Sequence, residues 1–169
     1  MGTVLALMQI SNAALAILLV FGALPARSEI VWDTFVEPER GTRVDFPSGI
    51  FASVDGPSQK GLGQMFSTTD GRAVLAIYSQ RNEGETPPRY VRENFKVPRK
   101  TIDYKRVTRT FFAISAVHEG DIYYSRCNFS RGSSSAIHCF DLKYPRREKR
   151  AWDRIVTRIS RSLRPLERE

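Results

Sequence analysis

Two cysteines set the strictest limit on how this chain can fold, because they lie symmetrically about a turn-forming loop. Cys127 and Cys139 are each six residues from Ser133. Ser133 itself lies in a loop that contains one glycine and three serines. The flanking stretches 122–130 and 136–144 are rich in Tyr, Phe and Ile, which favour β-strands. In a hairpin centred on Ser133 the two cysteines face one another, at a distance that a disulfide can bridge. The spacing therefore predicts a cross-strand disulfide and the register of the hairpin.

The same strand pattern extends upstream of the hairpin. We expect strands over 101–109 and 110–118, so that residues 101–144 form a four-stranded antiparallel meander. Residues 30–85 alternate apolar stretches with turn signals, and Asp70-Gly71 is the sharpest hairpin signal among them. Between these regions, a segment that begins Thr86-Pro87-Pro88 predicts a short helix, because Thr can cap a helix and Pro is tolerated in its first turn.

An amphipathic helix over about residues 146–164 is expected to close the fold. Pro145 and Pro165 lie at its two ends, where helices tolerate proline. Apolar residues recur at one-face spacing and are expected to pack on the sheet: Trp152, Ile155, Val156, Ile159 and Leu163. The opposite face carries an arginine stripe: Arg147, Arg150, Arg154, Arg158 and Arg161.

The first 28 residues have the layout of a secretory signal peptide. No Lys, Arg, Asp or Glu precedes Arg27, and small residues follow the apolar centre at Ala26 and Ser28. The apolar run at 13–24 is twelve residues long, shorter than the ~20 that a membrane-spanning helix needs. The leader lacks the usual basic residue before its apolar centre, so an uncleaved anchor stays open as the alternative. We expect cleavage after Ser28, export to the periplasm or the medium, and no transmembrane segment afterwards.

Residues 29–169 would then form one domain, large enough for a hydrophobic core of its own. In an exported protein a pair of nearby cysteines favours a disulfide. The pair has neither the Cys-x-x-Cys spacing of a zinc site nor that of a redox motif. We expect no metal site and no cofactor.

The basic charge is unevenly distributed. The mature chain has 25 Lys and Arg against 18 Asp and Glu, and residues 143–169 hold ten basic and four acidic side chains. The preceding 114 residues are left almost neutral, so we assign the basic character to the C-terminus. Exposed guanidinium groups suit anionic partners, because each can bind a carboxylate or phosphate bidentately. The stripe predicts anion binding to an envelope protein, an anionic polymer or a lipid surface, with a merely solvated helix face as the alternative.

Nucleic acid is a disfavoured partner, because no nucleic-acid-binding motif accompanies the charge. Catalytic signatures are scarce as well. His118 ends a predicted strand beside Glu119, and His138 alternates with Phe140, which predicts that it packs against the sheet. Gly61-Leu62-Gly63 lacks the third glycine of a dinucleotide-binding loop. We therefore favour a non-catalytic protein and keep a small exported hydrolase as the alternative.

Three features together carry a family resemblance. Phe46-Pro47-Ser48-Gly49-Ile50-Phe51 is like an opening, proline-bearing strand, and a helix interrupts the strands in mid-chain. The last strand ends in Tyr144-Pro145, and the closing helix contains Ile155, Ile159 and Ser162 before Leu163. In this order of features the chain resembles the Mog1/PsbP-like superfamily. The resemblance implies a small α/β/α domain with a central antiparallel sheet, and a non-enzymatic binding or assembly role.

The sequence as a whole predicts an α+β fold. We expect an antiparallel sheet of about six or seven strands, a short mid-chain helix, and a C-terminal amphipathic helix packed on the sheet. The expected function is that of an exported, non-catalytic binding or assembly factor of the cell envelope.

Overall fold

The computed structural model describes residues 29–130 and 135–166. The predicted signal peptide (1–28), the centre of the Ser-rich loop (131–134) and the last three residues lie outside the described part. Within the described ranges, no helix is long and apolar enough to cross a bilayer.

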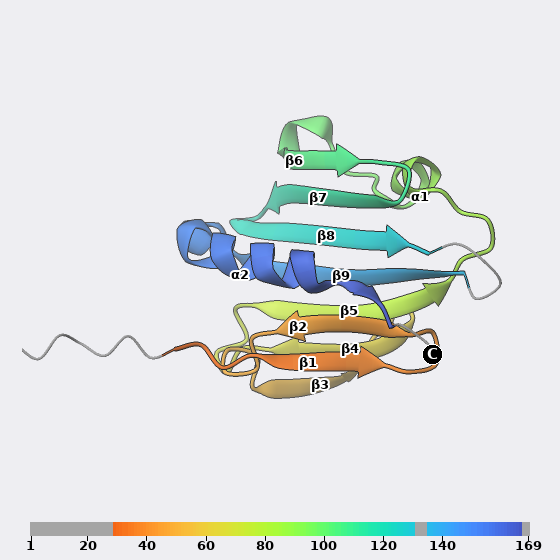
Figure 1. Ribbon diagram of the computed structural model, residues 1–169. Coiled ribbons are helices and arrows are strands. Elements are labelled where there is room, and N and C mark those ends of the chain that lie inside the picture. Colours follow the sequence, from red (N-terminus) through yellow and green to blue (C-terminus); the bar gives the residue numbers. More distant parts are fainter. Residues whose placement is uncertain (1–28, 131–134, 167–169) are drawn as a thin grey trace, which may run out of the picture.

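A seven-stranded antiparallel sheet forms the centre of the molecule, in the order β3-β4-β5-β9-β8-β7-β6 (Figure 1). The predicted meander is confirmed as the last four strands of this sheet in chain order, β6 to β9, and the Asp70-Gly71 turn joins β4 to β5 as expected. Gly71 adopts a φ of +66°, the left-handed conformation that such a turn requires. The strands are β3 (Ser53–Pro57), β4 (Leu62–Ser67), β5 (Val74–Arg81), β6 (Ile102–Val107), β7 (Phe111–His118), β8 (Asp121–Phe129) and β9 (Ala136–Pro145).

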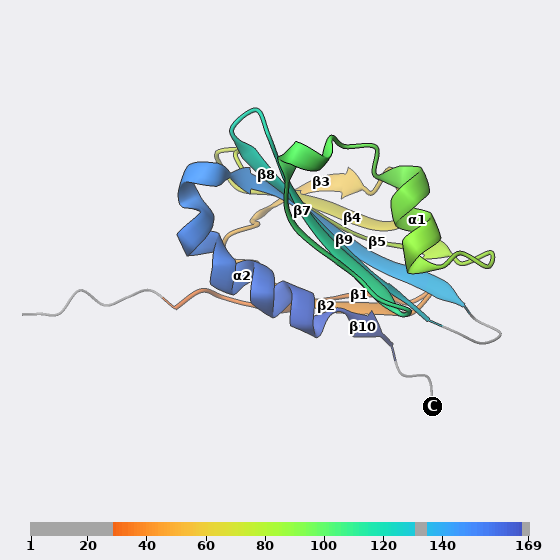
Figure 2. The ribbon, with the colours of Figure 1, turned by 90° about the horizontal axis from the view of Figure 1, so that it is seen from above.

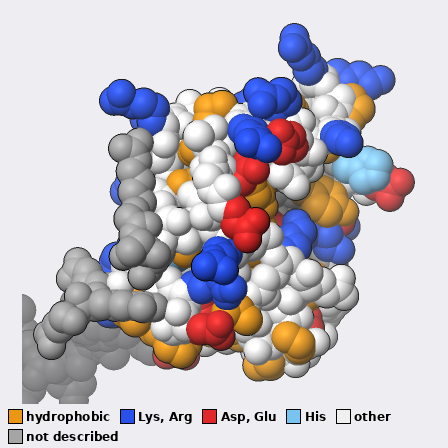
Figure 3. All heavy atoms as spheres, turned by 90° about the vertical axis from the view of Figure 1, so that its right-hand side faces the viewer, with side chains coloured by type: hydrophobic (Ala, Val, Ile, Leu, Met, Phe, Trp, Pro, Cys, Tyr) orange, Lys and Arg blue, Asp and Glu red, His pale blue; other side chains and the backbone are white. Residues whose placement is uncertain are grey.

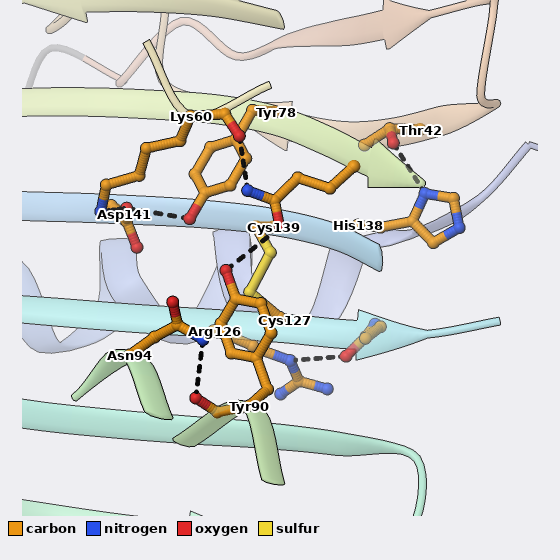
Figure 4. Close-up of a disulfide and its surroundings, with 12 residues drawn as sticks. Thr42, Lys60, Tyr78, Tyr90, Asn94, Arg126, Cys127, His138, Cys139 and Asp141 are labelled. Atoms are coloured by element: carbon orange, nitrogen blue, oxygen red, sulfur yellow. Dashed lines mark hydrogen bonds and ion pairs between the residues drawn. A yellow bond between two sulfur atoms is a disulfide. The ribbon is translucent and has the colours of Figure 1, made fainter. Parts of the chain in front are cut away.

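The register of the β8–β9 hairpin is confirmed. Cys127 lies directly opposite Cys139, with Cα atoms 4.1 Å apart and sulfur atoms 2.00 Å apart. Both cysteines are fully buried, and the pair belongs to an apolar cluster that includes Phe112. Figure 4 shows Tyr78 and Tyr90 beside the disulfide.

A second, three-stranded sheet departs from the single sheet that we expected. Its strands are β1 (Asp33–Glu37), β2 (Thr42–Phe46) and β10 (Arg164–Pro165), with β2 in the middle. β10 has only two residues and contains a proline, which is tolerated at a sheet edge but gives no strand signal in the sequence. The apolar stretch Ile30-Val31-Trp32 lies before β1 and is not a strand; the Gly49 N–H donates to its Val31 carbonyl at 3.2 Å.

Two helices cover opposite faces of the large sheet. Figure 2 shows α2 (Lys149–Ser162) and the small sheet on one face, and α1 (Pro87–Asn94) on the other. Short 3₁₀ turns precede β6 and α2, namely η1 (Arg99–Thr101) and η2 (Arg146–Glu148). The apolar face of α2 is buried as predicted, at Trp152, Ile155, Val156 and Ile159, with Leu163 beyond its end.

Candidate anion-binding groove

Two buried serines fix the position of α2 on the sheets. Ser162 Oγ accepts a hydrogen bond from the Asp45 N–H at 2.8 Å, which joins α2 to β2. Ser160 Oγ accepts one from Arg126 Nη1 at 2.8 Å and lies 3.1 Å from the hydroxyl of Tyr124 on β8. These contacts hold the helix at a defined orientation over both sheets, with its basic face outward.

The basic face of α2 borders a groove of about 610 Å³ that β2 and β10 complete. Three residues of the predicted stripe line the groove: Arg154, Arg158 and Arg161. They lie side by side because they follow the i, i+4, i+7 spacing of one helix face. Arg164 of β10 is a fourth lining arginine, and all four side chains are exposed. We call these four residues the arginine groove.

The other two arginines of the predicted stripe do not line the groove. Arg147 lies in η2, where the chain turns with three residues per turn, and its Nε is 3.7 Å from Glu148 Oε1. Arg150 is exposed in the first turn of α2 and stays outside the lining set. The stripe is therefore divided. The α-helix begins at Lys149 and not at residue 146, which leaves Arg147 outside it, and the groove begins farther along the helix than Arg150.

The carboxylates of the groove already have partners. Asp45 Oδ1 accepts a hydrogen bond from Thr34 Oγ1 at 2.9 Å, and Asp153 Oδ1 lies 3.2 Å from Lys149 Nζ. Within residues 29–130 and 135–166, no ion pair joins any of the four groove arginines to an acidic side chain. Among the described residues, the acidic side chains thus leave these four guanidinium groups unpaired.

Two contacts from the early part of the chain were not predicted. The Arg158 guanidinium carbon lies 4.0 Å from the centroid of the Trp32 ring, a stacking geometry that orients the guanidinium donors.

The second contact pairs two arginines, since Arg43 of β2 lies directly opposite Arg164 of β10. The Nε atom of Arg43 is buried with no hydrogen-bond partner in the described part of the chain. Like charges in directly opposed positions destabilise a sheet. No periodicity in the sequence marks these residues, because the contacts join segments from opposite ends of the described chain.

The two histidines are not part of the arginine groove. His138 is buried as expected, and its Nδ1 is 2.7 Å from Thr42 Oγ1 (Figure 4). Burial lowers the pKa of His138, an effect that the charge of Glu37 opposes. His118 is exposed, with its Nε2 3.5 Å from Glu119 Oε1. Neither histidine lines the arginine groove or either of two other surface grooves.

The remaining candidate motif has a structural explanation. Gly61-Leu62-Gly63 leads into β4 and is not a phosphate-binding loop. A Cβ on Gly63 would lie 2.0 Å from the Ile77 carbonyl oxygen of β5, so only glycine fits this close approach. Among the described residues, no group of three or more His, Cys, Asp or Glu side chains is arranged to hold a metal ion.

Comparison with known proteins gives a match at the level of the fold. No protein-family model matches the sequence, and no curated protein matches it. The structure is similar to the solution structure of cyanobacterial PsbP (CyanoP) from Synechocystis sp. PCC 6803, with a TM-score of 0.58 and 11% identity over 86% of this chain and 98% of that chain. The expected resemblance is thus confirmed as a PsbP-like fold, without separate support for Mog1.

Proposed function

We propose that this protein is an exported, non-catalytic binding or assembly factor of the cell envelope, and that it binds an acidic chain in the arginine groove. The observation that carries the proposal is that Arg154, Arg158, Arg161 and Arg164 line one groove without an ion-pair partner in the described part of the chain. A binding role also agrees with what the resemblance to the Mog1/PsbP-like superfamily implies.

The spacing of the arginines favours a chain-like ligand over a single ion. Arg154, Arg158 and Arg161 are separated by about 6 and about 4.5 Å along the helix axis. Carboxylates on one side of an extended peptide are spaced by about 6.5–7 Å, which guanidinium groups on flexible stems can match. The stacked Arg158 starts with restricted motion, so it loses less conformational entropy on binding. Asp45 and Asp153 also line the groove, and their negative charges would repel an anion that does not pair with the arginines.

In the part of the chain that the structure describes, no geometric observation favours the hydrolase alternative. A hydrolase site of the general acid–base kind needs a histidine and a carboxylate within reach of a substrate pocket. His138 contacts Thr42 in the interior, and His118 stands on the open surface beside Glu119. Neither histidine lines the arginine groove, whose two carboxylates, Asp45 and Asp153, have partners of their own.

The test is a binding measurement on the mature protein with three anionic probes: poly-L-glutamate, heparin, and phosphatidylglycerol vesicles. The variant R154E/R161E changes the groove and spares the stacked Arg158. Its matched control is R81E/R109E, which makes the same change of net charge at two exposed arginines outside the groove. We expect the groove variant to bind poly-L-glutamate at least about tenfold more weakly.

The control should retain the affinity of the parent protein. Equal losses in both variants would mean that only the overall charge matters, and the arginine groove would then have no binding role. If the protein binds the vesicles but neither polymer, its partner is a lipid surface and not an acidic chain.

A further inference from the structure

A second groove opens on the other face of the large sheet, between α1 and β6, with a volume of about 310 Å³. Its floor consists of Val91 and Ile114, which are 5% and 2% exposed. Phe95, Val97 and Ile102 form its apolar walls. Because α1 lies on the opposite face from α2 (Figure 2), this groove is separate from the arginine groove.

The groove exists because α1 is too short to cover this end of the sheet. The helix has eight residues and ends at Asn94, and Phe95 leaves it with a non-helical φ of −108°. The chain then passes through η1 into β6, which leaves Val97 40% exposed. The apolar side chains around the groove are consequently only partly covered by the protein itself.

The rim of the groove is basic. Arg92 and Lys105 line it, and Lys96, Arg99 and Lys100 are exposed on the segment that connects α1 to β6. No ion pair involves these five side chains within residues 29–130 and 135–166. Figure 3 shows Lys and Arg side chains gathered over the upper part of the face that it presents.

This charge corrects our assignment of the basic character to the C-terminus alone. Residues 89–109 contain eight basic and two acidic side chains. One of those two, Glu93, pairs with Arg89, which does not line the groove: its Oε1 lies 3.0 Å from Arg89 Nε. The positive charge of this segment does not show in the net charge of residues 29–142, because acidic residues elsewhere in that range balance it.

The edge of the sheet beside the groove distinguishes a polypeptide from a membrane as the occupant. β6 is the last strand in the order of the large sheet and pairs only with β7 in the described part of the chain. An unpaired strand edge offers backbone hydrogen bonds to an extended segment of another protein. A lipid surface would use neither this edge nor a concave apolar floor.

We propose that the groove between α1 and β6 is a second docking site, whose occupant is a segment of a partner protein with a large apolar side chain flanked by carboxylates. The apolar side chain would pack on Val91 and Ile114. The carboxylates would pair with Arg92 and Lys105, which satisfies the charge complementarity of the rim. This site does not depend on the arginine groove, and its position on the opposite face allows both to be occupied together.

The test uses a fluorescent octapeptide, Glu-Asp-Glu-Leu-Phe-Glu-Asp-Glu, and a control peptide in which Ser-Ser replaces Leu-Phe. Both peptides carry the same charge, so their difference in affinity reports burial of the apolar side chains. We expect the mature protein to bind the Leu-Phe peptide at least about tenfold more tightly than the control.

Two pairs of variants locate the site. Val97→Glu should abolish the difference between the peptides, whereas Val54→Glu, the same change at an exposed valine of β3, should leave it intact. Lys105→Glu should weaken binding of the Leu-Phe peptide about tenfold, and Arg81→Glu should not. R154E/R161E should leave the difference between the peptides unchanged, which separates this proposal from the arginine groove.

Equal affinity for the two peptides would overturn the proposal, because it would leave only a charged surface. Retention of the difference in Val97→Glu would overturn it as well. If phosphatidylglycerol vesicles bind the protein, lose that binding in Val97→Glu, and are not displaced by the peptide, the occupant is a membrane and not a protein segment.

Discussion

At the residue scale, Arg158 differs from its neighbours on α2 because it stacks on Trp32. We expect Arg158→Ala to lower the free energy of unfolding by about 0.5–1 kcal/mol, the usual worth of an exposed cation–π contact. Arg154→Ala should change this free energy by less, because Arg154 stacks on no aromatic ring in the described part of the chain. Urea unfolding of both variants, repeated in a Trp32→Leu background, measures the difference. A difference that persists without the indole ring would contradict the stacking.

His138 predicts a pH dependence of stability. Burial lowers its pKa in the folded protein below the ordinary value of 6.5, so the unfolded chain binds the proton more readily. The contribution of the neutral imidazole is therefore complete above about pH 6.5 and is lost as the pH falls toward the lowered folded-state pKa. In urea unfolding between about pH 7.5 and pH 5, His138→Gln should lack this loss.

His118→Gln is the matched control, because that side chain is exposed at the end of β7. It should retain the pH dependence of the parent protein. If His138→Gln loses stability on acidification as steeply as the parent does, other groups are responsible and the account of His138 is wrong.

At the element scale, the β8–β9 hairpin carries the cysteine pair, which the structure brings to disulfide distance. Oxidation in the exported protein is a prediction. The double variant Cys127→Ala/Cys139→Ala should lower the free energy of unfolding by about 3 kcal/mol, because the unfolded chain regains the freedom of a short closed loop. Thiol titration of the denatured parent protein should find no free thiol. Two titratable thiols would contradict the disulfide.

The elements that the sequence predicted are those with local signals. The meander and its register follow from strand composition and from the symmetry of two cysteines about Ser133, and α2 follows from apolar periodicity. The three-stranded sheet has no such signal, because β10 consists of Arg164-Pro165 and pairs with β2 from the other end of the chain. Proline at a helix end was interpreted correctly as a stop, but nothing local indicates the strand that follows it.

At the scale of the whole molecule, the sequence predicted three of the four arginines of the arginine groove. Helical spacing is enough to bring Arg154, Arg158 and Arg161 to one face. Tertiary contacts determine the rest. They bring Arg164 into the groove, stack Trp32 on Arg158, and leave Arg147 and Arg150 outside the groove. The second basic segment, 89–109, was present in the composition and would have been found by counting charge in shorter windows.

Export is the part of the proposed function that concerns the whole chain. Cleavage after Ser28 would leave Glu29 at the N-terminus, next to the Ile30-Val31-Trp32 segment that reaches α2. Mass spectrometry of the protein from its native envelope should find Glu29, or a residue two or three positions away, as the first residue. An intact leader in the membrane fraction would make the protein an anchored one and contradict the cleaved form.

The arginine groove is the central claim, and side-chain NMR tests it most directly. The Nε–Hε signals of the mature protein are recorded while penta-L-glutamate is added. We predict saturable shifts for Arg154, Arg158, Arg161 and Arg164, with Arg147 and Arg150 unaffected although they belong to the same stretch of arginines. Shifts of equal size at all six residues, or at none of them, would contradict a groove that selects its ligand by geometry.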